Sequence, residues 1–182
     1  MEKETKERLI DPYLIDLAGR EHTAYIIAYS HLDKTIQTFN IARIIGDVRI
    51  EDTTYKIPSD FDANQCMSTA WGVDIRGKLR TIKLHFTASA GKIIINTPLH
   101  SSQISELQKD ESLIVTFKLR LSFSFIHWIL AQGDDVKVLE PAILKDLILK
   151  INDSVRQMYE TDNHGQTSIT DRIEGWLLEA NM

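Results

Sequence analysis

Residues 23–45 read TAYIIAYSHLDKTIQTFNIARII, and this stretch decides the fold of the N-terminal part of the chain. Residues 23–29 are almost continuously apolar and too few for a stable lone helix, so they predict a strand buried on both faces. The segment His31-Leu-Asp-Lys34 predicts a hairpin turn, and residues 36–45 predict the returning strand. The stretch therefore predicts an antiparallel pair of strands.

The returning strand carries side chains of interest for binding. The two-residue period of a strand places Gln37, Phe39 and Arg43 on one face. A further strand is predicted before the pair, because the largely apolar residues 9–17 end at the turn signal of residues 18–19. Three consecutive strands with short connections predict a small antiparallel barrel or sandwich.

The second half of the chain combines strands with helices. Residues 81–86 and 113–121 alternate apolar and polar side chains, which is typical of strands with one buried face. A helix is predicted over residues 123–132, between a serine cap and Gly133. After Pro141, apolar residues at helical spacing predict a long amphipathic helix. The chain is therefore predicted to have a mixed α+β fold.

Composition excludes several classes of protein. The chain has 182 residues and a formal net charge of −5, so bulk charge does not attract nucleic acid, and any such contact requires a local basic patch. The single cysteine, Cys66, excludes an internal disulfide and suits a reducing compartment. The apolar runs are too short to span a membrane, and the N-terminus lacks the apolar core of a signal peptide. We expect a soluble cytoplasmic protein with no membrane partner.

No catalytic motif is present in the sequence. It contains no glycine-rich phosphate loop, no serine elbow and no zinc-protease helix motif. Residues Asp60, Asp62 and Asn64 begin like a calcium loop, but Gln65 and Trp71 stand where that loop needs glycine and glutamate. The six histidines show no metal-ligand spacing. We expect a protein that is not an enzyme and that needs no cofactor or metal.

An ordered set of short motifs resembles the WYL domain of bacterial transcriptional regulators. The triplet that names the domain reads Ala24-Tyr25-Ile26 in this chain. The motifs that carry the resemblance are Arg8-Leu-Ile-Asp-Pro12, Thr23 to Tyr29, Phe39-Asn-Ile-Ala-Arg43-Ile44 and Pro58-Ser-Asp-Phe-Asp62. Later motifs resemble the C-terminal extension that follows a WYL domain: Trp71-Gly-Val73, Ile82 to Phe86, Leu99 to Gln103, Ile126 to Leu130 and Val138 to Pro141. The resemblance covers about residues 8–159.

The resemblance implies a domain organisation. Residues 1–7 are a charged lead-in, and residues 8–70 form the WYL domain, a small five-stranded β-barrel of the Sm or SH3 kind. Residues 71–159 form the ferredoxin-like α/β C-terminal extension. Residues 160–182 are a polar tail with an amphipathic piece that either docks on a surface or frays.

In one segment of the extension, the family pattern and the local propensity predict different secondary structures. Residues 88–96 are helical in the family pattern, although Lys92-Ile-Ile-Ile-Asn96 has β propensity. Thr87 is available to cap a helix there. We expect the helix.

The resemblance also implies a ligand site in the WYL barrel. Arg8, Tyr25 and Arg43 match positions of the family's pocket, and Gln37 and Phe39 share the predicted face of Arg43. An aromatic ring stacks on a base, and a guanidinium binds phosphate through two hydrogen bonds. The implied function is an effector-sensing and dimerising module that binds single-stranded nucleic acid or a nucleotide-like ligand.

The chain departs from the family pattern at four positions. The tryptophan of the triplet is Ala24, two usual basic positions are Gln37 and Asn40, and the acid before Arg43 is Ala42. Two interpretations remain open: a sensor of a less charged effector, or a structural dimerisation module whose pocket binds nothing. For the family's motifs in the extension, His100 and Gln103 are expected to have a structural role, and Trp128 an ordinary packing role.

The family also suggests partners. Its members are typically homodimers in which the second domain reaches across to the other copy. Full-length members carry a winged helix-turn-helix before the WYL domain, for which the seven residues before Arg8 are too few. Contact with duplex DNA is therefore expected only through such an attached domain.

Overall fold

The computed structural model describes residues 5–18, 23–75, 77–161 and 169–181. The chain divides into two compact units. Unit 1 comprises residues 1–67 and 72–75, and unit 2 comprises residues 68–71 and 76–182. Antiparallel sheets and helices occur together, so the mixed α and β character predicted from the sequence is confirmed.

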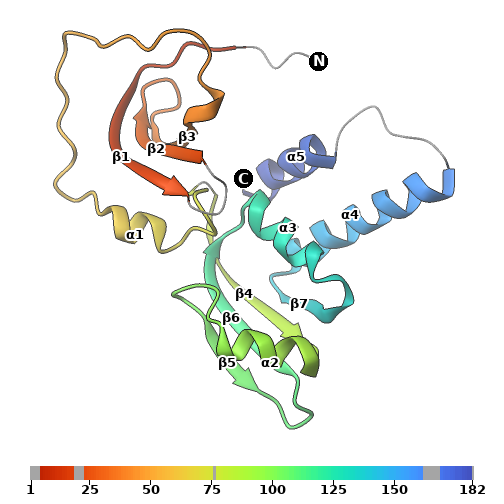
Figure 1. The fold of residues 1–182 in the computed structure, drawn as a ribbon. Coiled ribbons are helices and arrows are strands. Elements are labelled where there is room, and N and C mark those ends of the chain that lie inside the picture. The colour runs from red at the N-terminus through yellow and green to blue at the C-terminus, as the bar shows by residue number, and fades with distance from the viewer. Residues whose placement is uncertain (1–4, 19–22, 76, 162–168, 182) are drawn as a thin grey trace. The chain divides into compact units, whose positions relative to one another are not determined.

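Unit 1 contains an antiparallel sheet in the order β1-β2-β3 (Figure 1). The strands are β1 (Ile10–Ala18), β2 (Thr23–Ser30) and β3 (Thr35–Asn40). In the central strand β2, the side chains of Ile27 and Ala28 point to opposite faces and are both 0% exposed. The prediction of a strand buried on both faces is confirmed there.

The prediction that the third strand extends to Ile45 is wrong. β3 ends at Asn40, and residues Ile41–Arg43 form the short 3₁₀ helix η1. The side chain of Asn40 accepts a hydrogen bond from the backbone N–H of Ala42 at 2.8 Å. This local bond satisfies a backbone donor at the start of η1 and turns the chain out of the sheet.

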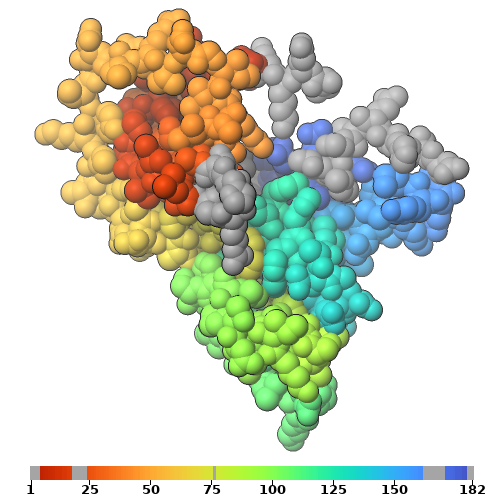
Figure 2. Space-filling model, viewed as in Figure 1, coloured from red at the N-terminus to blue at the C-terminus, as the bar shows by residue number. Residues whose placement is uncertain are grey.

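The described residues of unit 1 contain three strands and form no closed barrel. Residues 44–57 belong to no helix or strand, and Ile45, Val48 and Ile50 are strongly exposed. Figure 1 draws this segment as coil passing outside the sheet, and Figure 2 shows its orange and yellow atoms at the surface of unit 1. The short helix α1 (Ala63–Met67) follows.

Unit 2 contains a four-stranded antiparallel sheet in the order β5-β6-β4-β7. Its elements follow the chain as β4 (Leu79–Phe86), α2 (Ala88–Asn96), β5 (Ile104–Leu107), β6 (Leu113–Arg120), α3 (Phe123–Ala131), η2 (Gly133–Asp135), β7 (Val136–Glu140), α4 (Ala142–Thr161) and α5 (Ile169–Asn181). The predicted alternation holds. Ile82, Leu84 and Phe86 of β4 are buried, as are the five apolar residues predicted to share a face: Leu113, Val115, Phe117, Leu119 and Leu121.

The predicted helix at residues 88–96 is confirmed as α2. The Thr87 hydroxyl accepts a hydrogen bond from the backbone N–H of Ala90 at 3.4 Å. Gly91 lies so close to β6 that a Cβ atom there would stand 2.8 Å from the Cβ of Leu113. Burial of Ile94 against the sheet outweighs the β propensity of this segment.

The amphipathic piece near the C-terminus is helix α5, and it docks on its own unit. Ile173 and Leu177 are buried in the core of unit 2 together with Leu144, Leu147 and Ile151 of α4. No helix within the described ranges is long and apolar enough to cross a membrane.

Candidate ligand site on the N-terminal sheet

The strand register divides the predicted site residues between two faces of the unit 1 sheet. Residues directly opposite one another on antiparallel strands share a face. Gln37 lies opposite Ala28, and Phe39 lies opposite Ile26. Tyr25 lies opposite Asn40 and therefore points to the other face. Gln37 and Phe39 share a face as predicted, whereas Tyr25 faces away from both.

Arg8 belongs to a polar cluster at the hairpin end of the sheet. Its guanidinium donates a hydrogen bond to the Asp33 carboxylate. The Ser30 hydroxyl donates to the same Asp33 oxygen at 2.8 Å. The hydrogen bond from Ser30, followed by the charge of Arg8 and hydrogen bonds from Arg8 and Gln37, holds the pKa of Asp33 below its ordinary value against the effect of desolvation. An anion approaching Arg8 therefore competes with an internal carboxylate.

Arg43 lies in a different environment. It is the last residue of η1 and is exposed, and the described ranges contain no ion pair to it. The prediction that Arg43 shares a strand face with Phe39 and Gln37 is wrong, because η1 breaks the two-residue period after Asn40. Its guanidinium is accessible to an external anion.

Tyr25 and Asn40 lie beside η1 at the opposite end of the sheet from Arg8. The Asn40 side-chain amide donates a hydrogen bond to the Tyr25 hydroxyl at 3.3 Å. Tyr25 and Ser30 are five residues apart on β2, which corresponds to about 17 Å. The predicted site is therefore two clusters. The Tyr25 cluster comprises Tyr25, Asn40 and Arg43, and the Arg8 cluster comprises Arg8, Ser30, Asp33 and Gln37.

An aromatic group that sequence reasoning missed lies along β1. The Tyr13 ring is 4.9 Å from the Phe61 ring and 6.4 Å from the Tyr55 ring, between ring centroids. The Tyr55 hydroxyl donates a hydrogen bond to the Pro12 carbonyl. Desolvation, followed by the charge of Asp11, raises the pKa of Tyr13. These contacts hold residues 55–61 against β1, and only the aromatic residue types gave a signal of them.

A second missed contact pairs His31 with β1. His31 Nε2 lies 2.9 Å from a carboxylate oxygen of Asp11. The His31 ring stands edge-on to the Tyr29 ring, with centroids 5.3 Å apart. Sequence reasoning assigned His31 only to the hairpin turn, because its partner lies 20 positions away in the sequence.

The family motifs of unit 2 have the structural roles expected of them. His100 Nε2 lies 3.1 Å from the Ala70 carbonyl oxygen, and burial lowers the pKa of His100 despite that bond. The Gln103 side chain accepts a hydrogen bond from the backbone N–H of Leu99 at 2.8 Å. The Trp128 ring packs against the Trp71 ring, with the ring centroids 4.8 Å apart.

Residues that resembled metal ligands in the sequence have other roles. The side chain of Asp62 accepts hydrogen bonds from the backbone N–H groups of Asn64 and Gln65, at the start of α1. Among the side chains that the structure describes, no group of three or more His, Cys, Asp or Glu residues is placed to hold a metal ion.

Two family models match the chain. One describes the WYL domain and matches residues 1–50, and the other describes the WCX domain and matches residues 78–152. The chain carries a WYL domain followed by a WCX domain. Together the two matches span more than half of the sequence, and the resemblance to WYL domain-containing regulators is confirmed. Both candidate clusters lie in the WYL domain. The families indicate regulatory sensing rather than catalysis.

A solved structure also resembles the chain. It is the proteasome accessory factor B/C (PafBC) of Arthrobacter aurescens, with 14% sequence identity and a TM-score of 0.36. The match covers 88% of this chain and 24% of PafBC, so the chain spans about a quarter of the length of that protein. A TM-score this low does not establish a shared arrangement, and the family assignment rests on the two domain matches. A comparison with curated proteins finds no significant match.

Proposed function

We propose that the chain is the effector-sensing and dimerising part of a bacterial transcription regulator, and that its WYL domain binds single-stranded nucleic acid or a nucleotide-like ligand. The observation that carries the proposal is the Tyr25 cluster: an exposed arginine without an internal carboxylate, beside a half-buried tyrosine, at one end of the sheet. The WYL and WCX domain matches support the regulatory role.

The side-chain types of the Tyr25 cluster suit this ligand class. The Arg43 guanidinium offers two parallel N–H groups to a phosphate. The Asn40 side chain bonds to Ala42 and to Tyr25 and so fixes the end of the strand, and the Tyr25 ring is an aromatic surface for stacking. In this proposal the Arg8 cluster has a supporting role, because Asp33 already neutralises Arg8.

For ligand binding to affect an attached DNA-binding domain, the regulator must have two arrangements that differ in their affinity for the ligand. We propose that a homodimer supplies these arrangements, and that ligand binding in the WYL domain changes the spacing of attached winged helix-turn-helix domains. The order β4-α2-β5-β6-α3-β7 with antiparallel pairing supports a ferredoxin-like extension. An Sm-like barrel in unit 1 would require further strand pairing, for which residues 44–57 are the available segment.

The test is fluorescence anisotropy with labelled single-stranded DNA oligomers at two salt concentrations. Arg43→Ala is expected to weaken binding by about tenfold or more and to lower the salt dependence, because a charge-assisted contact to phosphate is lost. Arg49→Ala is the matched control: Arg49 is 81% exposed, belongs to the same unit and stands 4.0 Å from Glu7. Equal binding by Arg43→Ala and the unmodified chain, or an equal loss in both variants, would contradict the proposal.

A purely structural dimerisation module is the second candidate. It is favoured by the internal pairing of Arg8 with Asp33, which occupies one of the predicted phosphate contacts. This function predicts a stable dimer whose melting temperature does not change with oligonucleotide concentration, whereas a sensor is stabilised as ligand increases. Light scattering and thermal unfolding at several oligonucleotide concentrations separate the two candidates.

A further inference from the structure

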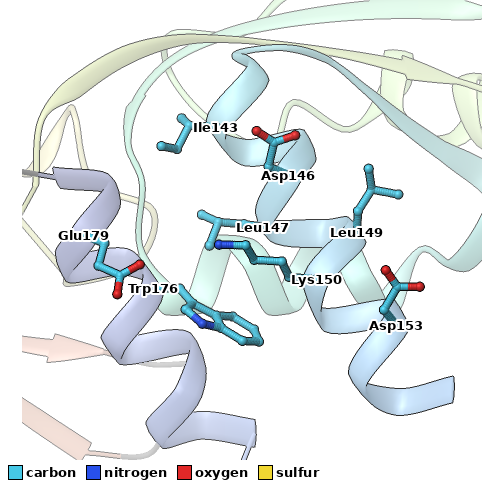
Figure 3. A pocket seen from close by; sticks show the side chains of 8 residues that line it. All are labelled: Ile143, Asp146, Leu147, Leu149, Lys150, Asp153, Trp176 and Glu179. Carbon is cyan, nitrogen blue, oxygen red and sulfur yellow. The ribbon is translucent and has the colours of Figure 1, made fainter. Parts of the chain in front are cut away.

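A groove lies between α4 and α5 in unit 2 (Figure 3). It has a volume of about 420 Å³, which is within the range of small-molecule sites. The lining residues are Ile143, Asp146, Leu147, Leu149, Lys150 and Asp153 of α4, and Trp176 and Glu179 of α5. The α5 side of the groove lies outside the residues matched by the WCX model, which end at 152.

The charges around the groove are mostly negative. Asp146 and Asp153 are seven residues apart on α4, which corresponds to about 10 Å along the helix axis. Glu179 contributes a third carboxylate from α5. Lys150 is the one basic residue of the lining, and no ion pair to it occurs within the described residues. An anionic ligand would therefore be repelled, and a cation is favoured.

Lys150 and Trp176 indicate which kind of cation the groove accepts. The Lys150 ammonium nitrogen lies 5.9 Å from the centroid of the Trp176 ring. Figure 3 shows Lys150 extending from α4 toward α5, where Trp176 and Glu179 lie. The aromatic face thus already holds an alkylammonium group supplied by the chain itself. Apolar side chains of the lining, such as Ile143 and Leu147, offer contact to methylene groups.

We propose that this groove binds a linear polyamine. One ammonium group of the ligand replaces Lys150 over the Trp176 ring, and the others lie near Asp146, Asp153 and Glu179. The alkyl chain between the ammonium groups lies along the apolar residues of α4. This site is independent of the Tyr25 cluster, and it would make the module responsive to a small cationic metabolite.

The test is isothermal titration calorimetry of the whole chain with spermidine. Saturable binding is expected, and Trp176→Leu should weaken it by about tenfold through loss of the aromatic face. Lys150→Met should tighten binding by several-fold, because the competing internal ammonium is removed. Glu179→Gln, at an exposed position, should also weaken binding, and it keeps the test valid if Trp176→Leu unfolds α5.

The matched control is Lys145→Met. Lys145 is exposed on the same helix but does not line the groove, so this variant makes the same change of net charge. An equal tightening in Lys145→Met and Lys150→Met would indicate general attraction to an acidic protein and would overturn the proposal. Absence of saturable heat, or displacement of spermidine by magnesium at an equal charge concentration, would overturn it as well.

Discussion

The two units of the chain differ in how completely they bury their apolar residues. Among the described residues of unit 2, eighteen buried apolar side chains form a single core. In unit 1, Ile27 and Ala28 of β2 are buried, but Ile15 and Leu17 of β1 and Ile45, Val48 and Ile50 of the following segment are exposed. Unit 2 therefore has its own source of stability, whereas unit 1 has apolar surface still available to a ligand or a partner.

The largest expected effect lies in the core of unit 2. Phe117 is 1% exposed on the central part of the sheet, and Phe117→Ala is expected to lower the free energy of unfolding by about 3–5 kcal/mol. Ile50→Ala in unit 1 is the control, because Ile50 is 95% exposed and its truncation should change stability by less than about 0.5 kcal/mol. Urea unfolding measures both. A large cost of Ile50→Ala would mean that unit 1 buries this segment in solution.

Ligand binding should reduce the difference in stability between the two units. A single-stranded DNA oligomer at about one hundred times its dissociation constant should stabilise the WYL domain by about 2.7 kcal/mol. Hydrogen exchange followed by mass spectrometry should then show slower exchange in β2 and unchanged exchange in β6. Equal protection of both strands would show that the ligand does not act on unit 1 alone.

A smaller effect on stability is expected from a substitution where α2 packs on the sheet. Gly91→Ala places a Cβ atom 2.8 Å from the Cβ of Leu113, so it should cost about 1–3 kcal/mol through overpacking. Gly175→Ala is the matched change in α5, where the new Cβ meets no described atom within 4 Å beyond its chain neighbours and its own helix backbone. That variant should stabilise the helix by about 0.5–1 kcal/mol. Thermal unfolding should therefore show shifts of opposite sign, and shifts of the same sign would contradict the packing of α2.

The smallest effect concerns the Arg8 cluster and depends on pH. The folded-state pKa of Asp33 lies below its ordinary value of 3.8, so its contribution to stability is present above that value and is lost as pH falls through the folded-state pKa. Asp33→Asn should reduce the acid-induced destabilisation of unit 1 below about pH 4. Asp47→Asn, at an exposed position of the same unit, is the control. Hydrogen exchange of β2 at several pH values measures the effect, and identical pH profiles for both variants would refute it.

Sequence reasoning was most successful where neighbouring residues decide the structure. Three patterns of neighbouring residues each predicted an element that the structure contains. They are the apolar run of residues 23–29, the alternation of β4 and β6, and the helical stripe of α4. The family assignment followed from an ordered set of short motifs, which also depends only on the order of residues along the chain. The residue types of the candidate site could also be identified from these motifs.

Contacts that no repeating pattern encodes decided the rest. The hydrogen bond from the Ala42 backbone N–H to the Asn40 side chain is local, yet it ended β3 and removed Arg43 from the strand face assigned to it. Asp33 neutralises Arg8 across 25 positions of sequence, which the turn pattern alone did not indicate.

The same distinction accounts for α2 and for the groove of unit 2. α2 is a helix against its local propensity because Gly91 and Ile94 pack on the sheet. The groove exists only because Lys150 and Trp176, 26 positions apart, meet when α5 docks on α4. The sequence by itself determined the elements and the family, since these depend on short-range patterns. The tertiary structure decided which side chains meet, since that depends on strand register and on packing between elements distant in sequence.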